Sequence, residues 1–380
     1  MIAQSHMDID LPTPLLGGLS PQVFMRRHWQ KKPLLVRQAV PGGVVLIGRS
    51  ELFNLASHDE VESRLVVRDG ARWSLRQGPF RRAALPALKR PGWTLLVQGL
   101  DLHVPAAREL LDRFRFVPDA RLDDVMLSYA SDGGGVGPHV DSYDVFLLQA
   151  TGRRRWRIGR VRAPRMVEGA PLKILANFEA EQEWLLEPGD MLYLPPGWAH
   201  DGVADGECTT CSIGFRAAGR DELGREVLQR MLDAADADDR GPLYRDPTQP
   251  ATATPGRVPA DLQRFAADAV ARLLADPEAL ASAIGEVLSE PKRGVWFDAS
   301  AAAGAAESAV VALDQRTRMI YDERHVFVNG ESFRAAGRDA TLMRRLADDR
   351  RLARADVARL GAGARELLGE WLDAGWVRLA

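Results

Sequence analysis

The sequence predicts a β-rich α+β protein with more than one domain. Its first 220 residues contain many short segments rich in β-branched, aromatic and leucine residues, and each is bounded by Gly, Pro or Asp turns. After Phe215 the apolar residues recur at helical spacing instead. The chain has 380 residues, well beyond a typical domain of roughly 150. Many short strands separated by turns favour a barrel or a sandwich over a parallel α/β sheet.

The first part of the chain is expected to combine these strands with helices at 20–30 and 102–115. The strand segments include Pro33–Arg37, Arg64–Val67, Trp93–Gln98, Asp124–Tyr129, Val145–Gln149, Arg154–Ile158, Met191–Leu194 and Cys208–Phe215.

Three amphipathic helices are expected next, at 220–236, 260–275 and Pro277–Ser289, with a Pro-, Thr- and Gly-rich loop at 241–258. Helices of this kind outside a β domain commonly bury their apolar face against one another or against a second copy of the chain.

The last part of the chain is expected to form a small module. Asn329–Gly330 between Val326–Val328 and Ser332–Phe333 is a strong two-residue hairpin signal. Helices are expected at 339–350, 354–361 and 363–374, followed by a closing strand, Trp376–Leu379. Helices beside a hairpin resemble a winged helix. Because residues 339–374 hold seven arginines and seven acids, a structural or partner-docking role is favoured over direct nucleic-acid binding.

Composition narrows the function classes further. The 50 basic residues, only five of them lysine, and the 52 acidic residues leave a net charge of −2, so no overall field recruits DNA or anionic lipid. Two cysteines suit a reducing compartment. We expect no signal peptide in residues 1–16 and no membrane span, because no run of about 18 apolar residues occurs. The expectation is a soluble, cytoplasmic protein.

The chemistry is concentrated in Gly133–Asp144 (GGGVGPHVDSYD) and in a histidine 61 residues after His139. On a strand, His139 and Asp141 project from the same face. His200 follows the rigid bend Pro195–Gly197. Two imidazoles and one carboxylate form the facial triad associated with non-haem Fe(II) oxygenases.

A lone His-x-Asp is a weak signal that usually marks surface residues or a local hydrogen bond. The glycine run, the bend and the distal histidine strengthen it. A phosphate loop is excluded because no Gly-Lys-Ser/Thr follows the glycines, which we expect to allow close approach of the backbone to a ligand.

Strand alternation separates the arginines of the run 153–157. Arg153, Arg155 and Arg157 share one face, whereas Arg154 shares the other with Trp156. An inward guanidinium needs a carboxylate partner, and a bound dicarboxylate such as 2-oxoglutarate would provide one. A solvated face or a phosphate contact is the alternative interpretation of the run.

The pair Cys208 and Cys211 is a poor zinc site, because no second pair exists and a strand would turn the two sulfurs to opposite faces. Four other histidines show no ligand-like spacing and are expected to be structural: His28, His58, His103 and His325.

Taken together, these segments resemble the bacterial ribosomal oxygenases of the Jumonji-C (cupin-type) superfamily. The resemblance lies in SYASDGGGVGPHVDSYDVFLLQATGRRRWRIG (128–159) and LEPGDMLYLPPGWAHDG (186–202), and also in 28–39, 62–66 (ESRLV), 77–80, 93–98 (WTLLVQ) and 121–129 (RLDDVMLSY). It implies a double-stranded β-helix at 1–217, a helical dimerisation region at 218–290 and a winged-helix-like domain at 291–380.

The same resemblance implies roles for individual residues. The metal ligands fall on His139, Asp141 and His200, and the 2-oxoglutarate anchor on Arg154. An acid and an aromatic that hold a substrate arginine fall on Asp124 and Tyr143, although a plain strand-end aspartate is the alternative for Asp124. Ser212 is a further candidate for the cosubstrate pocket. Ser131–Asp132, before the glycines, departs from the family pattern.

The implied activity is hydroxylation of the β-carbon of an arginine in a large-subunit ribosomal protein, with Fe(II), 2-oxoglutarate and O2, by a homodimer. Acids such as Asp132, Asp141 and Asp144 are expected to steer the basic substrate. A histidyl hydroxylase, a demethylase or an oxygenase of small molecules would use the same ligands. A non-enzymatic docking protein is disfavoured, because all four site residues are intact.

Overall fold

The computed structural model describes residues 8–234, 242–299 and 309–379. They form two compact units. The first contains the described residues up to Ala217 together with Gly294–Trp296, and the second contains Ala218–Arg293 and the chain from Phe297 onward.

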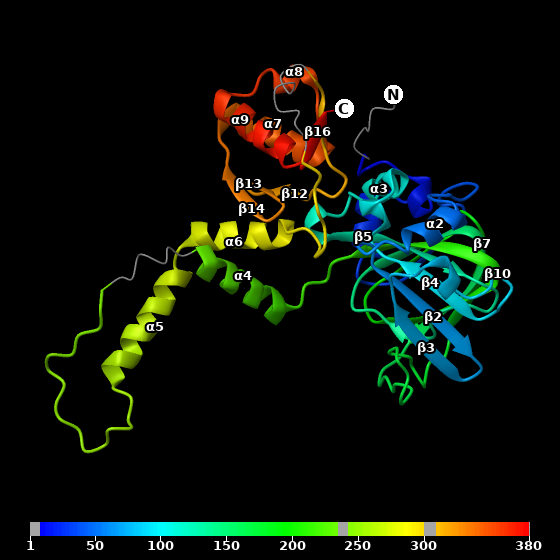
Figure 1. Ribbon diagram of the computed structural model, residues 1–380, viewed down its shortest axis with the longest axis horizontal. Coiled ribbons are helices and arrows are strands. Elements are labelled where there is room, and N and C mark those ends of the chain that lie inside the picture. Colours follow the sequence, from blue (N-terminus) through cyan, green and yellow to red (C-terminus); the bar gives the residue numbers. More distant parts are fainter. Residues whose placement is uncertain (1–7, 235–241, 300–308, 380) are drawn as a thin grey trace. The chain divides into compact units, whose positions relative to one another are not determined.

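The first unit is built on one ten-stranded antiparallel sheet, drawn in blue to green in Figure 1. Its strands are β1 (Leu34–Val36), β2 (Ser63–Asp69), β3 (Arg72–Gln77), β4 (Trp93–Val97), β5 (Leu122–Ala130), β6 (His139–Val140), β7 (Val145–Arg160), β8 (Gln182–Leu186), β9 (Met191–Leu194) and β10 (Trp198–Phe215). The order is β1-β9-β7-β10-β5-β4-β2-β3, while β6 pairs with β10 and β8 with β7.

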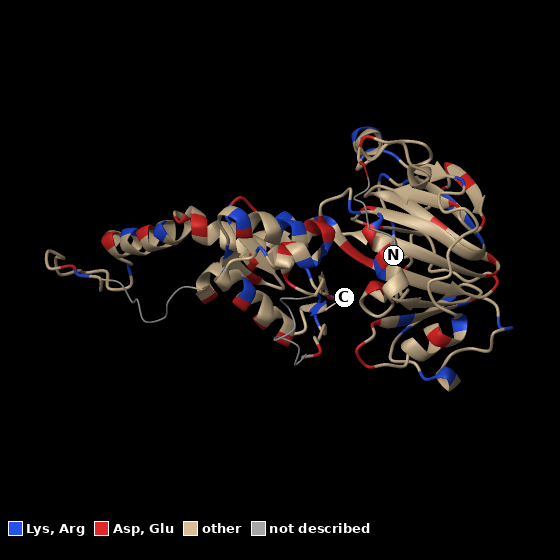
Figure 2. Cartoon of the chain, turned by 90° about the horizontal axis from the view of Figure 1, so that it is seen from above, with Lys and Arg blue, Asp and Glu red and all other residues tan. Residues whose placement is uncertain are grey.

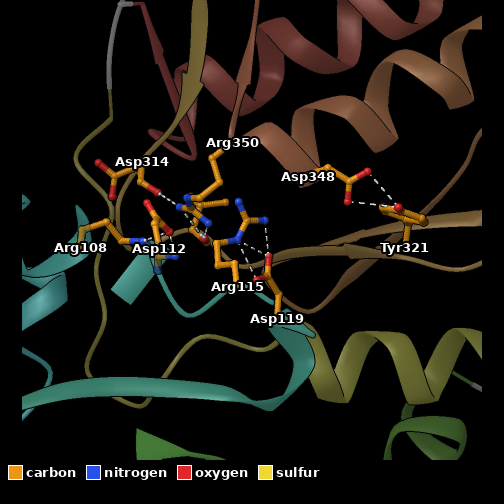
Figure 3. A network of polar contacts seen from close by, with 9 residues as sticks. Arg108, Asp112, Arg115, Asp119, Asp314, Tyr321, Asp348 and Arg350 are labelled. Atoms are coloured by element: carbon orange, nitrogen blue, oxygen red, sulfur yellow. Dashed lines mark hydrogen bonds and ion pairs between the residues drawn. The ribbon is translucent and has the colours of Figure 1, made fainter. Parts of the chain in front are cut away.

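Short helices accompany this sheet. They are η1 (Pro14–Leu16), α1 (Pro21–Arg27), α2 (Arg49–Leu55), η2 (Arg82–Ala84), η3 (Leu100–Leu102), α3 (Pro105–Asp112) and η4 (Asp119–Arg121). Helix α3 and the turn after it carry two ion pairs at i,i+4 spacing, Arg108–Asp112 and Arg115–Asp119 (Figure 3).

Strands β7 and β10 are longer than the sequence predicts. Val145–Gln149 and Arg154–Ile158 belong to the single strand β7, and Cys208–Phe215 is the second half of β10. Gly152 does not end β7. It adopts a φ of 62° where the register shifts, and the Thr151 and Thr209 hydroxyls hydrogen-bond at 2.7 Å across the irregularity. Where the sequence predicts two separate strands, the structure has one strand with a β-bulge.

The two faces of the sheet pack differently. One face is covered by the helices, because Phe24 of α1, Phe53 of α2 and Leu111 of α3 join Tyr129 and Phe146 in one buried cluster. The opposite face carries a smaller apolar cluster: Val145, Leu147, Trp156, Ile158, Leu186, Leu192 and Leu194. The candidate site lies on this second face.

The second unit combines helices with two three-stranded sheets, β15-β11-β16 and β12-β13-β14. Its helices are α4 (Arg220–Ala234), α5 (Ala260–Leu274), α6 (Pro277–Ser289), α7 (Gly337–Asp349), α8 (Arg354–Val357) and α9 (Ala362–Asp373). Its strands are β11 (Val311–Leu313), β12 (Met319–Tyr321), β13 (His325–Val328), β14 (Glu331–Arg334), β15 (Arg351–Leu352) and β16 (Val377–Leu379).

The hairpin prediction is confirmed, since β13 and β14 pair around Asn329 and Gly330, both at positive φ. The helix expected at 354–361 is wrong in length. Only α8 forms, because the amides of Arg359 and Leu360 bond three residues back and end the helical turn. The Tyr321 hydroxyl, 2.9 Å from Asp348, ties β12 to α7 (Figure 3).

Helix α6 packs against the β12-β13-β14 sheet at Gly285, where a Cβ atom would lie 2.2 Å from the Phe327 ring. It also packs against α4 through Val227, Met231 and Ala283. Helix α5 buries none of its residues. The part of helix 220–236 beyond Ala234, and residue 241 of the loop, lie outside the described residues. Within the described ranges, every helix is too short or too polar to cross a bilayer.

Candidate metal centre

The two predicted histidine ligands are direct cross-strand partners. Strand β6 pairs antiparallel with β10 so that His139 lies opposite His200, and paired residues project from the same face of a sheet. Asp141 follows His139 by two residues and returns to that face. The structure therefore brings His200 together with His139 and Asp141, which lie 61 and 59 residues earlier in the sequence.

The ligand atoms of this triad all lie within 4.8 Å of one another. The nearest Asp141 oxygens are 3.7 Å from His139 Nε2 and 3.6 Å from His200 Nε2. These distances exceed a hydrogen bond and leave space for a cation between the three groups. Two imidazoles and a carboxylate suit a divalent transition metal with open coordination positions.

Backbone carbonyls fix the orientation of both rings. His139 Nδ1 lies 2.9 Å from Gly137 O, and His200 Nδ1 lies 3.1 Å from Trp198 O. Because a carbonyl oxygen only accepts, each Nδ1 must donate. Each ring therefore carries a proton on Nδ1 and turns Nε2 toward the centre, which is the usual outer-shell arrangement of metal-bound histidine.

Burial sets the charge of these groups. His200 is almost fully buried, and burial together with the neighbouring His139 lowers its pKa to about 3, so the ring is neutral at pH 7. Burial raises the pKa of Asp141, while His139, the Tyr143 hydroxyl and Arg64 oppose this rise.

The glycines before His139 and the bend before His200 have local causes. A Cβ on Gly134 would lie 2.4 Å from Trp93 O, and one on Gly135 would lie 2.5 Å from Gly202 O. The close approach expected of these glycines is therefore to the protein's own strands. Gly197 has a φ of 82°, and its amide donates to Asp141 O at 3.0 Å. This bond ties the bend to the segment carrying a candidate ligand.

Arg154 points to the same face, as its strand parity predicts. Its side chain is 5% exposed, and Nη1 donates to Ser128 Oγ at 3.1 Å. Its Nε and Nη2 are buried without a hydrogen-bond partner among the described residues. The guanidinium lies 5.8 Å from the Trp156 ring centre, and the Trp156 and His200 rings are 5.9 Å apart. A buried cation with unused donors beside the triad suits the far carboxylate of a chelating dicarboxylate.

The neighbouring arginines are structural. Arg153, Arg155 and Arg157 point away from Arg154, and each pairs with an acid on an adjacent strand: Asp205, Glu183 and Asp201 respectively. The solvated-face interpretation of this run is therefore right for three of its members.

The predicted substrate residues lie on the same face. Asp124 is 4% exposed, and its Oδ2 accepts from Gly99 N at 3.1 Å, so one oxygen has the structural role considered as the alternative. Tyr143 is 39% exposed. Burial, followed by Asp141 and Asp124, raises the pKa of Tyr143. Ser212 is mostly buried opposite Met126.

The structure also shows the surroundings of Asp144 and of the two cysteines. Asp144 cannot steer a substrate, because it is fully buried and bound by Tyr193 Oη at 2.6 Å and Gln30 Nε2 at 3.0 Å. Cys208 and Cys211 are buried and free and lie in different clusters, as expected of structural thiols on opposite faces.

Sequence reasoning missed two polar residues on this face, Arg64 of β2 and Gln98 after β4. The Arg64 guanidinium donates to Gln98 Oε1 at 2.9 Å. Both belong to segments that carried the family resemblance, but no spacing connects them with the triad. Only the sheet order β5-β4-β2 does so.

Comparison with known proteins gives two family matches and close relatives. A JmjC domain model matches residues 109–223, and a ROXA-like winged-helix model matches 272–378. The chain is 38% identical over 276 residues to the ribosomal protein uL16 3-hydroxylase of Escherichia coli (strain K12), covering 71% of each chain. It is 36% identical over 221 residues to a probable ribosomal oxygenase of Haemophilus influenzae, covering 57% of this chain and 53% of that protein.

Solved structures extend the likeness over nearly the whole chain. The X-ray structure of E. coli YcfD superposes with a TM-score of 0.84 at 30% identity and covers 95% of this chain and 98% of that chain. The structure of YcfD, described as a ribosomal oxygenase in complex with cobalt and 2-oxoglutarate, has a TM-score of 0.77 at 30% identity with the same coverage. The predicted fold class is confirmed: a cupin-type JmjC sheet with a winged-helix-like C-terminal region.

Proposed function

This chain belongs to the JmjC-domain ribosomal oxygenases, and on that premise we propose that it is an Fe(II)- and 2-oxoglutarate-dependent hydroxylase of an arginine in a large-subunit ribosomal protein. One observation carries the proposal. A metal-type triad and a buried guanidinium with two unused donors lie on the same sheet face, and together they match the two ends of 2-oxoglutarate.

His139, Asp141 and His200 would hold the metal through Nε2, a carboxylate oxygen and Nε2. Bound Fe(II) with 2-oxoglutarate and O2 supplies the oxidising chemistry, in which the cosubstrate becomes succinate and carbon dioxide. Arg154 binds the far carboxylate with the help of Ser128 Oγ, and Ser212 adds a hydroxyl to the pocket. The surrounding apolar residues exclude water, so the charged contacts are stronger than they would be in solvent.

The proposed substrate is an arginine of a ribosomal protein, oxidised at its β-carbon. The E. coli relative is a 3-hydroxylase of ribosomal protein uL16, which supports a ribosomal substrate and oxidation at a β-carbon. In this proposal Asp124 binds the substrate guanidinium, and the exposed Tyr143 ring stacks on the arginine side chain. These two contacts would turn the β-carbon toward the metal.

We also propose a cytoplasmic homodimer whose dimerisation region is 218–290 and whose winged-helix-like domain, 291–380, docks protein and does not bind nucleic acid directly. Support for dimerisation comes from α5, whose apolar residues are exposed: Leu262, Phe265, Val270, Leu273 and Leu274. A ribosomal substrate supports the cytoplasm.

Mass spectrometry tests the activity. Purified ribosomal proteins are incubated with the enzyme, Fe(II) and 2-oxoglutarate, and fragment ions locate any gain of one oxygen atom. We expect the gain on an arginine of the uL16-type protein, its loss in His139→Ala, and its retention in His58→Ala, which changes an exposed histidine whose ring pairs with Glu60.

Other outcomes discriminate between the alternatives. Oxygen gained on a histidine, or loss of a methyl group from lysine, would move the substrate assignment within the same fold. Succinate released with a metabolite, with every ribosomal protein unmodified, would overturn the ribosomal substrate. A wild-type protein that binds neither metal nor 2-oxoglutarate would overturn the activity itself.

A further inference from the structure

Arg64 is a charged residue beside the candidate site whose role the metal and the cosubstrate do not explain. It lies on β2, outside the strands that carry the triad and Arg154. Among the described residues, no carboxylate lies within ion-pair distance of its guanidinium. Because arginine stays protonated at all ordinary pH values, this position holds a permanent positive charge.

The strand register places Arg64 on the face of the sheet that carries the site. Arg64 lies opposite Leu96 on β4, Leu96 lies opposite Ser128 on β5, and Ser128 is the residue that binds Arg154. Residues paired across antiparallel strands project from the same face. Arg64 and the cosubstrate anchor therefore share that face, with two inter-strand spacings of about 4.8 Å each between Arg64 and Ser128.

The guanidinium is fixed by two contacts. Nη2 donates to Gln98 Oε1 at 2.9 Å and lies 3.8 Å from Met126 Sδ. The contact with Gln98 uses the amide oxygen and leaves the amide N–H groups of Gln98 as donors. Arg64 and Gln98 thus present several hydrogen-bond donors, while the amide oxygen of Gln98 is engaged by Arg64.

Met126 separates this positive pair from a negative residue. Asp124 is two positions earlier on β5, on the same face and about 7 Å away along the strand. A substrate arginine held by Asp124 would have its guanidinium repelled by Arg64. The neighbouring oxygen atoms of the substrate chain are hydrogen-bond acceptors, which the donors of Arg64 and Gln98 can bind.

We propose that Arg64, held in place by Gln98, binds acceptor oxygens of the substrate polypeptide next to the hydroxylated residue and keeps the substrate guanidinium on the Asp124 side of Met126. This inference rests on the proposed function and adds a positioning residue to it. The oxygens are main-chain carbonyls or side-chain carboxylates of the substrate, and both accept hydrogen bonds from a guanidinium.

Kinetics of Arg64→Gln and Arg64→Lys test the inference, with a peptide spanning the hydroxylated arginine as substrate. Arg64→Gln should raise the KM for the peptide about tenfold or more, and Arg64→Lys should restore part of the loss because the charge returns. The KM for 2-oxoglutarate and the succinate released without peptide should stay within about twofold of wild type. Arg68→Gln is the matched control, since Arg68 is an exposed arginine on the same strand that contacts Gly70 and Trp73.

A second peptide, with its Asp and Glu residues replaced by Asn and Gln, separates the two oxygen sources. An undiminished effect of Arg64→Gln on this peptide identifies main-chain carbonyls, and a lost effect identifies carboxylates. Equal losses in peptide turnover and in peptide-free succinate release would overturn the inference in favour of a cosubstrate or structural role. Normal peptide kinetics in Arg64→Gln would overturn it directly. A wild-type enzyme that leaves the peptide unmodified would instead overturn the proposed function.

Discussion

Arg154 is a buried cation that the protein satisfies only in part. Ser128 accepts one hydrogen bond, while Nε and Nη2 find no acceptor among the described residues. An unpaired buried charge is strongly unfavourable. The folded protein without its cosubstrate must therefore carry this cost, and a bound carboxylate removes it.

We expect Arg154→Met to act in opposite directions on stability and on function. Removing the unpaired charge should raise the free energy of unfolding of the ligand-free protein by about 1–3 kcal/mol. The same change should weaken 2-oxoglutarate binding by about a hundredfold or more while metal binding is retained. Urea denaturation and isothermal titration with 2-oxoglutarate measure the two effects.

The control for this prediction is the adjacent arginine. Arg155→Met breaks a half-exposed pair with Glu183 and should change stability by less than about 1 kcal/mol, with 2-oxoglutarate affinity unchanged. Loss of metal binding in Arg154→Met, or tighter 2-oxoglutarate binding, would contradict the role assigned to Arg154.

Single residues of the site differ in how far sequence alone reveals them. His139, Asp141 and His200 are found from a motif, and the direction of Arg154 from strand parity. Arg64 and Gln98 are not found, because they meet the site only through the pairing of β2 with β4 and of β4 with β5. Local spacing carries no information about such non-local pairing.

At the scale of elements, the type of each segment is predicted better than its length. Gly152 indicates a break, yet β7 continues through it because the bulge opposite Thr209 absorbs the extra residue. The helix expected at 354–361 shortens to α8 for an equally local reason, a change to three-residue hydrogen bonds. Tertiary pairing and turn geometry decide these lengths.

The turn between β8 and β9 depends on one buried carboxylate. Asp190 is 2% exposed and accepts from the amides of Gln38 and Glu187 and from the Arg37 guanidinium. Burial alone would raise the pKa of Asp190, but these hydrogen bonds lower it overall. The turn joins the segment after β1 to the strands that precede His200.

Asp190→Asn should therefore lower the free energy of unfolding by about 1–3 kcal/mol at pH 7. A carboxylate with a lowered pKa stabilises the fold above the ordinary aspartate pKa of about 4, and this contribution is lost as the pH falls through the folded-state value. The difference between wild type and Asp190→Asn should be constant above about pH 5 and should shrink at lower pH.

Urea titrations at several pH values measure this difference. Asp205→Asn, which removes an exposed pair with Arg153, should cost less than about 1 kcal/mol across the range. A difference for Asp190→Asn that grows as the pH falls would contradict the assigned sign.

At the scale of the whole molecule, the charge distribution bears on partners. Acidic and basic residues are interspersed along both units (Figure 2), and the net charge is −2. The exposed residues of α9 include three acids, Glu366, Glu370 and Asp373. A helix that lies against a phosphate backbone needs basic residues, so these acids support the proposal that the winged-helix-like region docks protein.

Helix α5 has an exposed apolar face through which we propose that the chain dimerises, and substitutions on opposite sides of this helix can test that proposal. At 100° per residue, Leu262, Phe265, Ala269 and Leu273 fall on one face, and Ala271 lies on the opposite one. An apolar face of this width is unstable in water unless it is covered.

We expect light scattering to report twice the 41.8 kDa mass of the chain. Ala269→Glu should shift the protein to monomer by placing a charge on that face, whereas Ala271→Glu, the same substitution on the opposite side of the helix near Arg264, should leave the dimer intact. A wild-type mass of one chain at micromolar concentration, or dissociation by both variants alike, would contradict dimerisation through this face.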